Sequence, residues 1–385
     1  MREVRKDTAV VLSGGGINGV LMELGFLLRL RESPFWPRIG WIFGTSAGAL
    51  AGVLAALDRL DDLEEFLLSL QPEDTFRPNR LWRLPLLGLH EYALPQTIAE
   101  RFGDLTELAR ELRGSEIELV VCATDASPGD ELDVRDYELV YSSRHTPPEE
   151  MAQAVLASAA ISALVMPVRV GDRIATDGAW VRNFPLAHAY RRPGVREIVA
   201  FRYVPRYPRI GASGLTRLRT RLERFGRVPP VRAFIEELRL AEERDARGEP
   251  AHLPEMIMRL TRAAIVRNTV EEERAADETD ESIEELRRLR VDVLQLVRRN
   301  VRGKRERARL ESAIAERFET ARFPFRHYRA LPRLTVRASV DEVSLEPGFR
   351  DQKPWTVDAK RALIERGYAL TDQELASATA ISAAS

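Results

Sequence analysis

One stretch decides the fold of this chain: Phe43-Gly44-Thr45-Ser46-Ala47-Gly48-Ala49. Its Gly-x-Ser-x-Gly spacing is typical of a nucleophile elbow, a sharp turn between a strand and a helix that exposes a serine hydroxyl. Small residues flank such a serine because added Cβ atoms would collide with neighbouring backbone. Residues 41–43 indicate the end of a strand, and the Ala- and Leu-rich residues 47–57 indicate a buried helix. The alternative is a Gly/Ser turn without chemistry.

A glycine-rich turn precedes this stretch, between a strand predicted at residues 8–13 and a helix predicted to end at Arg31. Its sequence is Gly14-Gly15-Gly16-Ile17-Asn18-Gly19. Bare backbone N–H groups at the start of a helix form a cradle for an anion. The spacing also fits dinucleotide binding, but that function needs an acidic residue at the end of the next strand. Here the next strand instead runs into the serine turn. An oxyanion hole formed by this glycine-rich turn accounts for both turns, because it would serve a nucleophile at the serine turn.

An acidic residue follows a later strand, in the sequence Asp177-Gly178-Ala179. A hairpin is predicted before it, with strands at residues 166–170 and 173–176. In α/β folds, functional groups lie at the ends of strands, so Asp177 is a candidate. The alternative is that Asp-Gly forms an ordinary turn.

The composition of the chain limits the partners, metal sites and locations that we expect for the protein. The 385 residues carry a formal net charge of −1, so we expect no nucleic-acid partner. The single cysteine, Cys122, excludes an intrachain disulfide and a cysteine-based zinc cluster, and its apolar neighbours place it in a buried strand. The most apolar run, residues 151–168, is too short and too polar to span a membrane. We expect a cytoplasmic protein, with peripheral contact at the inner face of the membrane left open.

The C-terminal half has a different character. Arg- and Glu-rich helices are predicted at residues 215–224, 231–247, 255–268, 282–302 and 307–322, with an acidic loop at 271–281. We expect their charged faces to be solvated, while Arg217, Arg219, Arg221 and Arg224 leave open a membrane-facing helix. A strand at 333–339 and a helix at 356–366, ended by Gly367, return to the first unit.

The predicted domains are therefore a catalytic domain at 1–205, closed by a strand and helix at 330–370, and a helical cap or appendage at 206–329. Residues 371–385 are expected to be a disordered tail. Two further expectations are a single helix at 97–113 and an edge strand at 133–141 after a turn at residues 128–130. Residues 71–96 are expected to form either a lid or a connection packed on the core.

The three motifs, in this order, resemble those of the patatin-like phospholipases, which include bacterial-type lipid acyl hydrolases. Further matches are the sequences Ala157-Ser158-Ala159-Ala160 and Asn183-x-Pro185, and residues 359–368, which look like the family's closing helix. The resemblance implies a three-layer α/β/α fold, here with a mainly α-helical insertion in the C-terminal half. It also implies a Ser–Asp dyad, with Ser46 as nucleophile and Asp177 as base. Gly14, Gly15 and Gly16 would line the oxyanion hole, and Gly19, Gly44, Gly48 and Gly178 would support the motifs.

Two positions depart from the family pattern. Asn18 stands where a basic residue is usual, which removes a charge that could recognise an anionic headgroup, and Ser162 stands where a proline is usual. The expected function is a serine hydrolase of carboxylic esters in phospholipids or other lipids, without a metal or organic cofactor. Two alternatives stay open: a non-catalytic or switched-off lipid-binding module on the same fold, and a Ser-His-Asp esterase that uses His188.

Overall fold

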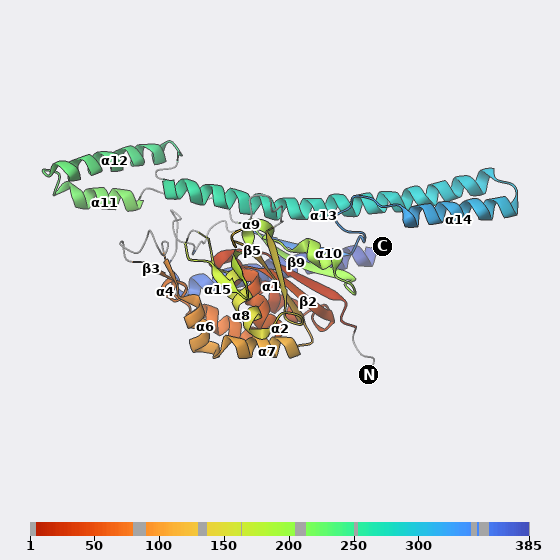
Figure 1. The fold of residues 1–385 in the computed structure, drawn as a ribbon, viewed down its shortest axis with the longest axis horizontal. Coiled ribbons are helices and arrows are strands. Elements are labelled where there is room, and N and C mark those ends of the chain that lie inside the picture. Colours follow the sequence, from red (N-terminus) through yellow and green to blue (C-terminus); the bar gives the residue numbers. More distant parts are fainter. Residues whose placement is uncertain are drawn as a thin grey trace.

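The computed structural model describes residues 5–79, 90–129, 137–162, 164–204, 213–249, 253–339, 345 and 354–384. A mixed sheet lies at its centre, with helices on both faces (Figure 1). The order of the strands is β10-β9-β1-β2-β5-β8-β7, and β6 also pairs with β5. Neighbours from β10 to β5 run parallel, whereas β6 and β8 run antiparallel to β5. The bounds are β1 (Thr8–Leu12), β2 (Ile39–Thr45), β5 (Glu118–Asp125), β6 (Glu138–Ser142), β7 (Val168–Val170), β8 (Arg173–Asp177), β9 (Glu197–Tyr203) and β10 (Arg333–Ala338).

Alternate residues of β1 show why the domain has three layers. Val10 and Leu12 pack on one face with helices that include α1 (Gly16–Arg31), α2 (Ala47–Ala56) and α3 (Leu60–Ser69). Ala9 and Val11 pack on the other face, with α10 (Leu186–Arg191) and α13 (Leu253–Asn300). Because successive side chains of a strand point to opposite faces, a strand that is apolar throughout must be covered on both sides. The predicted α/β class and layered architecture are confirmed.

The remaining elements complete the layers. They are η1 (Trp36–Arg38), α4 (Pro72–Thr75), α6 (Leu94–Phe102), α7 (Leu105–Gly114), α8 (Pro148–Ser158), α9 (Ala179–Arg182), α11 (Ser213–Glu223), α12 (Pro229–Ala246), α14 (Lys304–Thr320), α15 (Val357–Ala384) and a small sheet of β3 (Phe76–Pro78) and β4 (His90–Tyr92). The helix predicted at 97–113 is two helices, because Gly103 adopts φ +82° and Asp104 caps α7 through the Thr106 amide. Parts of three other predicted segments, at 80–89, 130 and 133–136, lie outside the described residues.

The prediction that Gly367 ends a helix is wrong, because α15 continues through it to Ala384. A Cβ atom at Gly367 would clash with the backbone of Met22, and one at Gly25 would clash with Ile364. Glycine therefore serves here to let α1 and α15 approach closely. Residues 371–384, expected to be disordered, also lie in α15, where Thr371 is fully buried and Asp372 pairs with Arg29 at 2.8 Å.

The acidic loop predicted at 271–281 is also wrong. These residues lie in the middle of α13, which runs unbroken for 48 residues across one face of the domain (Figure 1). The buried acids among them are paired rather than solvated: Glu272 binds Arg182 at 2.7 Å, and Glu273 binds Arg202 and Arg337. Paired carboxylates no longer repel one another, so the helix continues through them.

Candidate functional site

Ser46 lies at the turn between β2 and α2, with φ 54° and ψ −119°. This backbone conformation is unfavourable for a residue with a side chain and is found mainly where function requires it. Its glycine neighbours make the turn sterically feasible. A Cβ atom at Gly44 would lie 2.5 Å from the Gly48 carbonyl oxygen, and one at Gly48 would lie 2.6 Å from the Cβ atom of Leu12.

Asp177 ends β8, which pairs with β5 and so lies beside the carboxyl end of β2. The Ser46 hydroxyl donates to Asp177 Oδ2 at 2.9 Å. The other carboxylate oxygen, Oδ1, accepts a hydrogen bond from the Ala179 amide at 2.8 Å. Only 7% of Ser46 and 6% of Asp177 is exposed. Burial raises the pKa of Asp177 to about 6, against the opposing effect of these two hydrogen bonds.

Ser158, at the end of α8, supports the turn at Ser46 through two hydrogen bonds. Its hydroxyl accepts a hydrogen bond from the Ser46 amide at 2.8 Å and donates to the Cys122 carbonyl at 2.6 Å. Ser158 is fully buried. The sequence singles out Ser158 only as part of a family motif, since nothing local shows that it bonds to a residue 112 positions away.

The glycine loop 14–16 runs along the other side of Ser46. The Gly14 amide donates to the Asn183 carbonyl at 2.9 Å, so it is not available to a ligand. The amides of Gly15 and Gly16 donate to no acceptor in the described part of the chain, and they stand at the N-terminus of α1. The loop therefore offers two donors, while Gly14 keeps space open beside the serine Cβ atom.

The family model described as patatin-like phospholipase matches residues 10–190, which include Ser46, Asp177 and the glycine loop. The chain contains a patatin-like phospholipase domain. This match supports lipid acyl hydrolase activity in general terms. The crystal structure of VipD from Legionella pneumophila has 15% sequence identity and a TM-score of 0.43, and the match covers 97% of this chain and 67% of that chain. No curated protein sequence matches the chain.

The patatin-like domain contains a cavity of 660 Å³ at Ser46 and Asp177. Its walls are mostly aliphatic and come from α2, α3, α6, α7 and α8. Thr261, Ile265 and Thr269 of α13 line it as well, so this helix covers the site. Described residues of the segment 71–96 contribute Pro72, Phe76 and His90, which fits a wall of the site. Asn18 is instead buried, and its side-chain oxygen accepts from the Leu345 amide at 2.9 Å.

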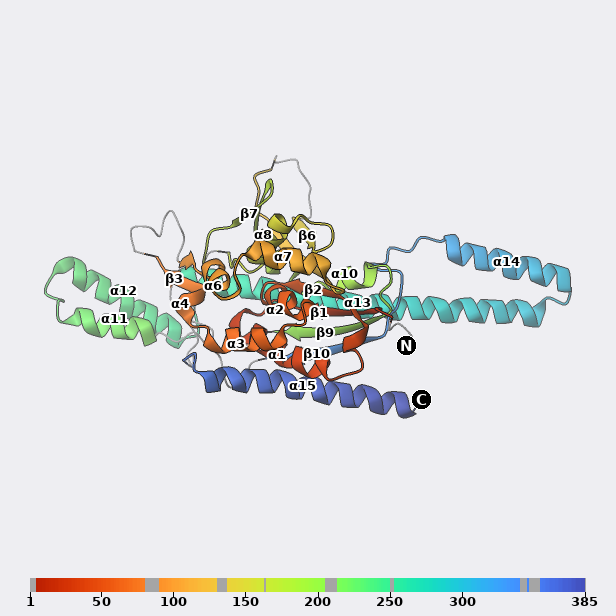
Figure 2. The ribbon, with the colours of Figure 1, turned by 90° about the horizontal axis from the view of Figure 1, so that it is seen from below.

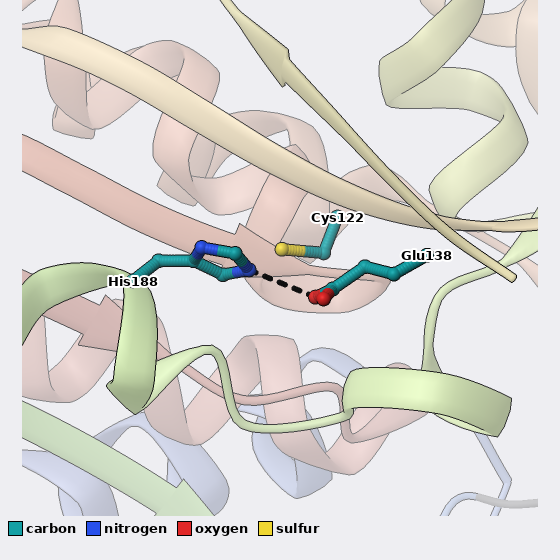
Figure 3. Close-up of side chains that lie close together, drawn as sticks. All are labelled: Cys122, Glu138 and His188. Atoms are coloured by element: carbon teal, nitrogen blue, oxygen red, sulfur yellow. Dashed lines mark hydrogen bonds and ion pairs between the residues drawn. The ribbon is translucent and has the colours of Figure 1, made fainter. Parts of the chain in front are cut away.

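His188 does not join the patatin-like site. Its Nε2 atom forms a hydrogen bond with Glu138 Oε1 at 2.8 Å (Figure 3), and no described contact links His188 to Ser46 or Asp177. The described contacts of His188 therefore do not support the triad that the sequence left open. In the described part of the chain, no helix is both long enough and apolar enough to cross a membrane.

Cys122, Glu138 and His188 form a cluster whose ligand atoms lie within 4.8 Å of one another (Figure 3). The Arg182 guanidinium already binds Glu138, and a metal ion would have to compete with this positive charge. Burial would raise the pKa of Glu138, but hydrogen bonds from His188 and Arg182 hold it at about 2. Burial also raises the pKa of the Cys122 thiol, which disfavours a thiolate ligand. Glu138 of β6 therefore joins Arg182 of α9 by an ion pair and His188 of α10 by a hydrogen bond, which fastens both helices to the edge of the sheet.

Proposed function

We propose that this protein is a serine hydrolase of carboxylic esters in lipids, with Ser46 as nucleophile and Asp177 as general base. One observation carries the proposal: a strained, buried serine donates to a buried carboxylate at 2.9 Å. A nucleophile and base within hydrogen-bond reach are the first requirement of covalent acyl transfer. The raised pKa of Asp177 makes this carboxylate a better base than an exposed one.

The proposed reaction has two stages. Ser46 Oγ attacks the ester carbonyl while its proton passes to Asp177, and the amides of Gly15 and Gly16 stabilise the oxyanion. The intermediate collapses and expels the alcohol, which takes the proton from Asp177. A water molecule then gives a proton to Asp177 and attacks the acyl-enzyme, and Ser46 recovers the proton as the carboxylic acid leaves. Loss of one oxyanion donor typically costs about 100-fold or more in rate.

The cavity supports a long acyl chain as the preferred substrate. Its aliphatic walls remove apolar surface from water, which contributes about 0.8 kcal/mol per buried methylene group. We therefore propose that ester hydrolysis becomes more efficient as the acyl chain lengthens, up to the capacity of the cavity.

We also propose that residues 1–205 and 330–370 form the catalytic unit and that residues 206–329 form a cap. Contacts of α13 at the site support this division. Thr269 accepts a hydrogen bond from the Asn183 amide group at 2.7 Å, and the Asn268 side chain donates to the Val181 carbonyl at 2.5 Å. The cap thereby touches the segment that engages the glycine loop.

Labelling by a fluorophosphonate probe and hydrolysis of a short-chain chromogenic ester test the proposal. Wild type should label and hydrolyse, Ser46→Ala should lose both, and Asp177→Asn should lose hydrolysis. His188→Asn is the matched control and should keep hydrolysis, because His188 lies outside the site. Absence of labelling in wild type, with and without lipid vesicles, would instead favour the non-catalytic lipid-binding module.

A further inference from the structure

Two helical hairpins extend from the domain on the side that α13 covers. One consists of α11 and α12, and the other of the C-terminal part of α13 with α14 (Figure 1). The view from below also shows them at opposite ends of the long axis (Figure 2). Neither hairpin tip contributes to the cavity at Ser46. Their surfaces therefore need a separate explanation.

The tip of the second hairpin, residues 298–309, is strongly basic. It contains seven arginine or lysine residues and one acid, Glu306, in a chain whose net charge is −1. Five cations of this tip are exposed and form no ion pair with any described residue: Arg299, Arg302, Lys304, Arg305 and Arg309. By contrast, Arg298 at the base of the tip pairs with Glu311 at 2.9 Å. The tip thus concentrates positive charge that the described residues leave largely without ion pairs.

Exposed apolar side chains accompany these charges. Leu296 is 58% exposed and Leu310 is 38% exposed, and both adjoin the tip. Leu289, on the same face of α13 as Leu296 because seven residues make two turns, is 51% exposed. An apolar stripe beside a cluster of cations is the composition of a segment that lies at a lipid interface.

The tip of the first hairpin, residues 224–232, repeats this combination. Phe225 and Val228 are each 49% exposed. Arg224 and Arg227 are exposed beside them, and the Arg224 guanidinium lies 4.7 Å from the centre of the Phe225 ring. Of the basic residues singled out in α11, Arg219 is instead paired with Glu242 at 3.0 Å. Cations and apolar groups therefore meet at both ends of the helical region.

We propose that the two hairpin tips form one docking surface for an anionic lipid bilayer. Each cation near an anionic membrane surface contributes about 1 kcal/mol, which is roughly a fivefold gain in partitioning. The exposed leucine, valine and phenylalanine side chains add apolar contact that nucleic-acid phosphates would not use. Docking at both tips would place α13, and the cavity it covers, along the membrane.

Flotation with vesicles tests this proposal on the full chain. The vesicles consist of phosphatidylcholine alone or of phosphatidylcholine and phosphatidylglycerol in equal amounts. All proteins carry Ser46→Ala, so that lipid hydrolysis cannot alter the vesicles. The parent should bind the anionic vesicles, weakly at high salt, and Arg299→Gln/Arg302→Gln/Arg305→Gln should bind them on the order of 100-fold less.

A matched control removes three exposed arginines elsewhere, as Arg169→Gln/Arg196→Gln/Arg361→Gln, and should keep most of the binding. A second variant, Phe225→Ser/Val228→Ser, should weaken the binding that persists at high salt. Equal loss in the control and the tip variant would overturn the proposal, as would equal binding to neutral vesicles. Tighter binding to a DNA duplex than to anionic vesicles at the same salt would assign the tips to nucleic acid instead.

A separate readout keeps this proposal independent of the catalytic one. The tip variant with an intact Ser46 should hydrolyse a water-soluble ester at the wild-type rate, because the tip lies outside the cavity. Membrane binding without hydrolysis would contradict only the proposed function. Hydrolysis without membrane binding would contradict only the docking surface.

Discussion

Replacing Ser158 by alanine tests whether the nucleophile depends on support from behind. The hydroxyl of Ser158 is fully buried and joins the Ser46 amide, at 2.8 Å, to the Cys122 carbonyl, at 2.6 Å. Ser158→Ala removes both hydrogen bonds at once. It leaves one buried donor, the Ser46 amide, and one buried acceptor, the Cys122 carbonyl, without these partners.

The expected loss of stability follows from the donor and the acceptor that lose their partners. An unsatisfied buried polar group costs about 1–3 kcal/mol, so the two groups left by Ser158→Ala should lower the free energy of unfolding by roughly 2–6 kcal/mol. The effect on rate is separate. The amide bond to Ser158 helps to hold Ser46 at φ 54°, and relaxation of this backbone would displace the hydroxyl from Asp177. A displacement of about 1 Å can cost about 100-fold in kcat/KM.

Two measurements check this prediction: urea unfolding followed by circular dichroism, and kcat/KM for a soluble chromogenic ester. Ser69→Ala is the control, since the Ser69 hydroxyl also donates to a backbone carbonyl, that of Phe66 at 2.8 Å, but Ser69 does not line the cavity. The control should lose about 1 kcal/mol or less and keep its rate. A Ser158→Ala protein with wild-type kcat/KM would show that the strained turn supports itself, and the reasoning would fail.

Three further predictions concern titration and packing. Because only ionised Asp177 can accept the serine proton, kcat/KM for a soluble ester should rise up to tenfold per pH unit below about pH 6 and then level off; a flat profile from pH 5 to 8 would contradict its role as base. Glu23 is fully buried without a partner among the described residues, and burial raises its pKa well above the usual value. The contribution of Glu23 to the free energy of unfolding is therefore present at low pH and is lost as pH rises through its folded-state pKa. The variant Glu23→Met cannot ionise, so its free energy of unfolding should exceed that of wild type, and the difference should grow with pH. Gly367→Val should lower the melting temperature by several degrees or prevent folding, because its side chain would clash with Met22; an unchanged melting temperature would show that α15 can shift away from α1.

Local sequence predicted the elements around the site because their signals are short-range. Glycine spacing, an apolar strand and an alanine-rich helix suffice to place the turn at Ser46. The meeting of Ser46 with Asp177, 131 residues later, depends on β8 pairing with β5, and the sequence supplied this only through the family resemblance. It could not show that the Gly14 amide is occupied, since its acceptor is the Asn183 carbonyl. Any residue type can supply a backbone carbonyl, so an acceptor this distant along the chain cannot be recognised from a sequence pattern.

The error at residues 271–281 has a physical cause that also bears on the hairpin tips. A run of acids is solvated unless cations of the same fold lie opposite it, and here Arg182, Arg202 and Arg333 come from α9, β9 and β10. The acidic middle of α13 therefore attaches to the domain largely through ion pairs. Breaking such a buried pair by removing one partner costs about 3–5 kcal/mol, so these contacts fix the position of the helix over the cavity. The C-terminal end of the same helix extends past the domain (Figure 1), and Arg299 near that end forms no ion pair with any described residue. The two parts of α13 thus differ in charge: the acidic middle binds its own domain, and we propose that the basic C-terminal end binds an anionic surface outside it.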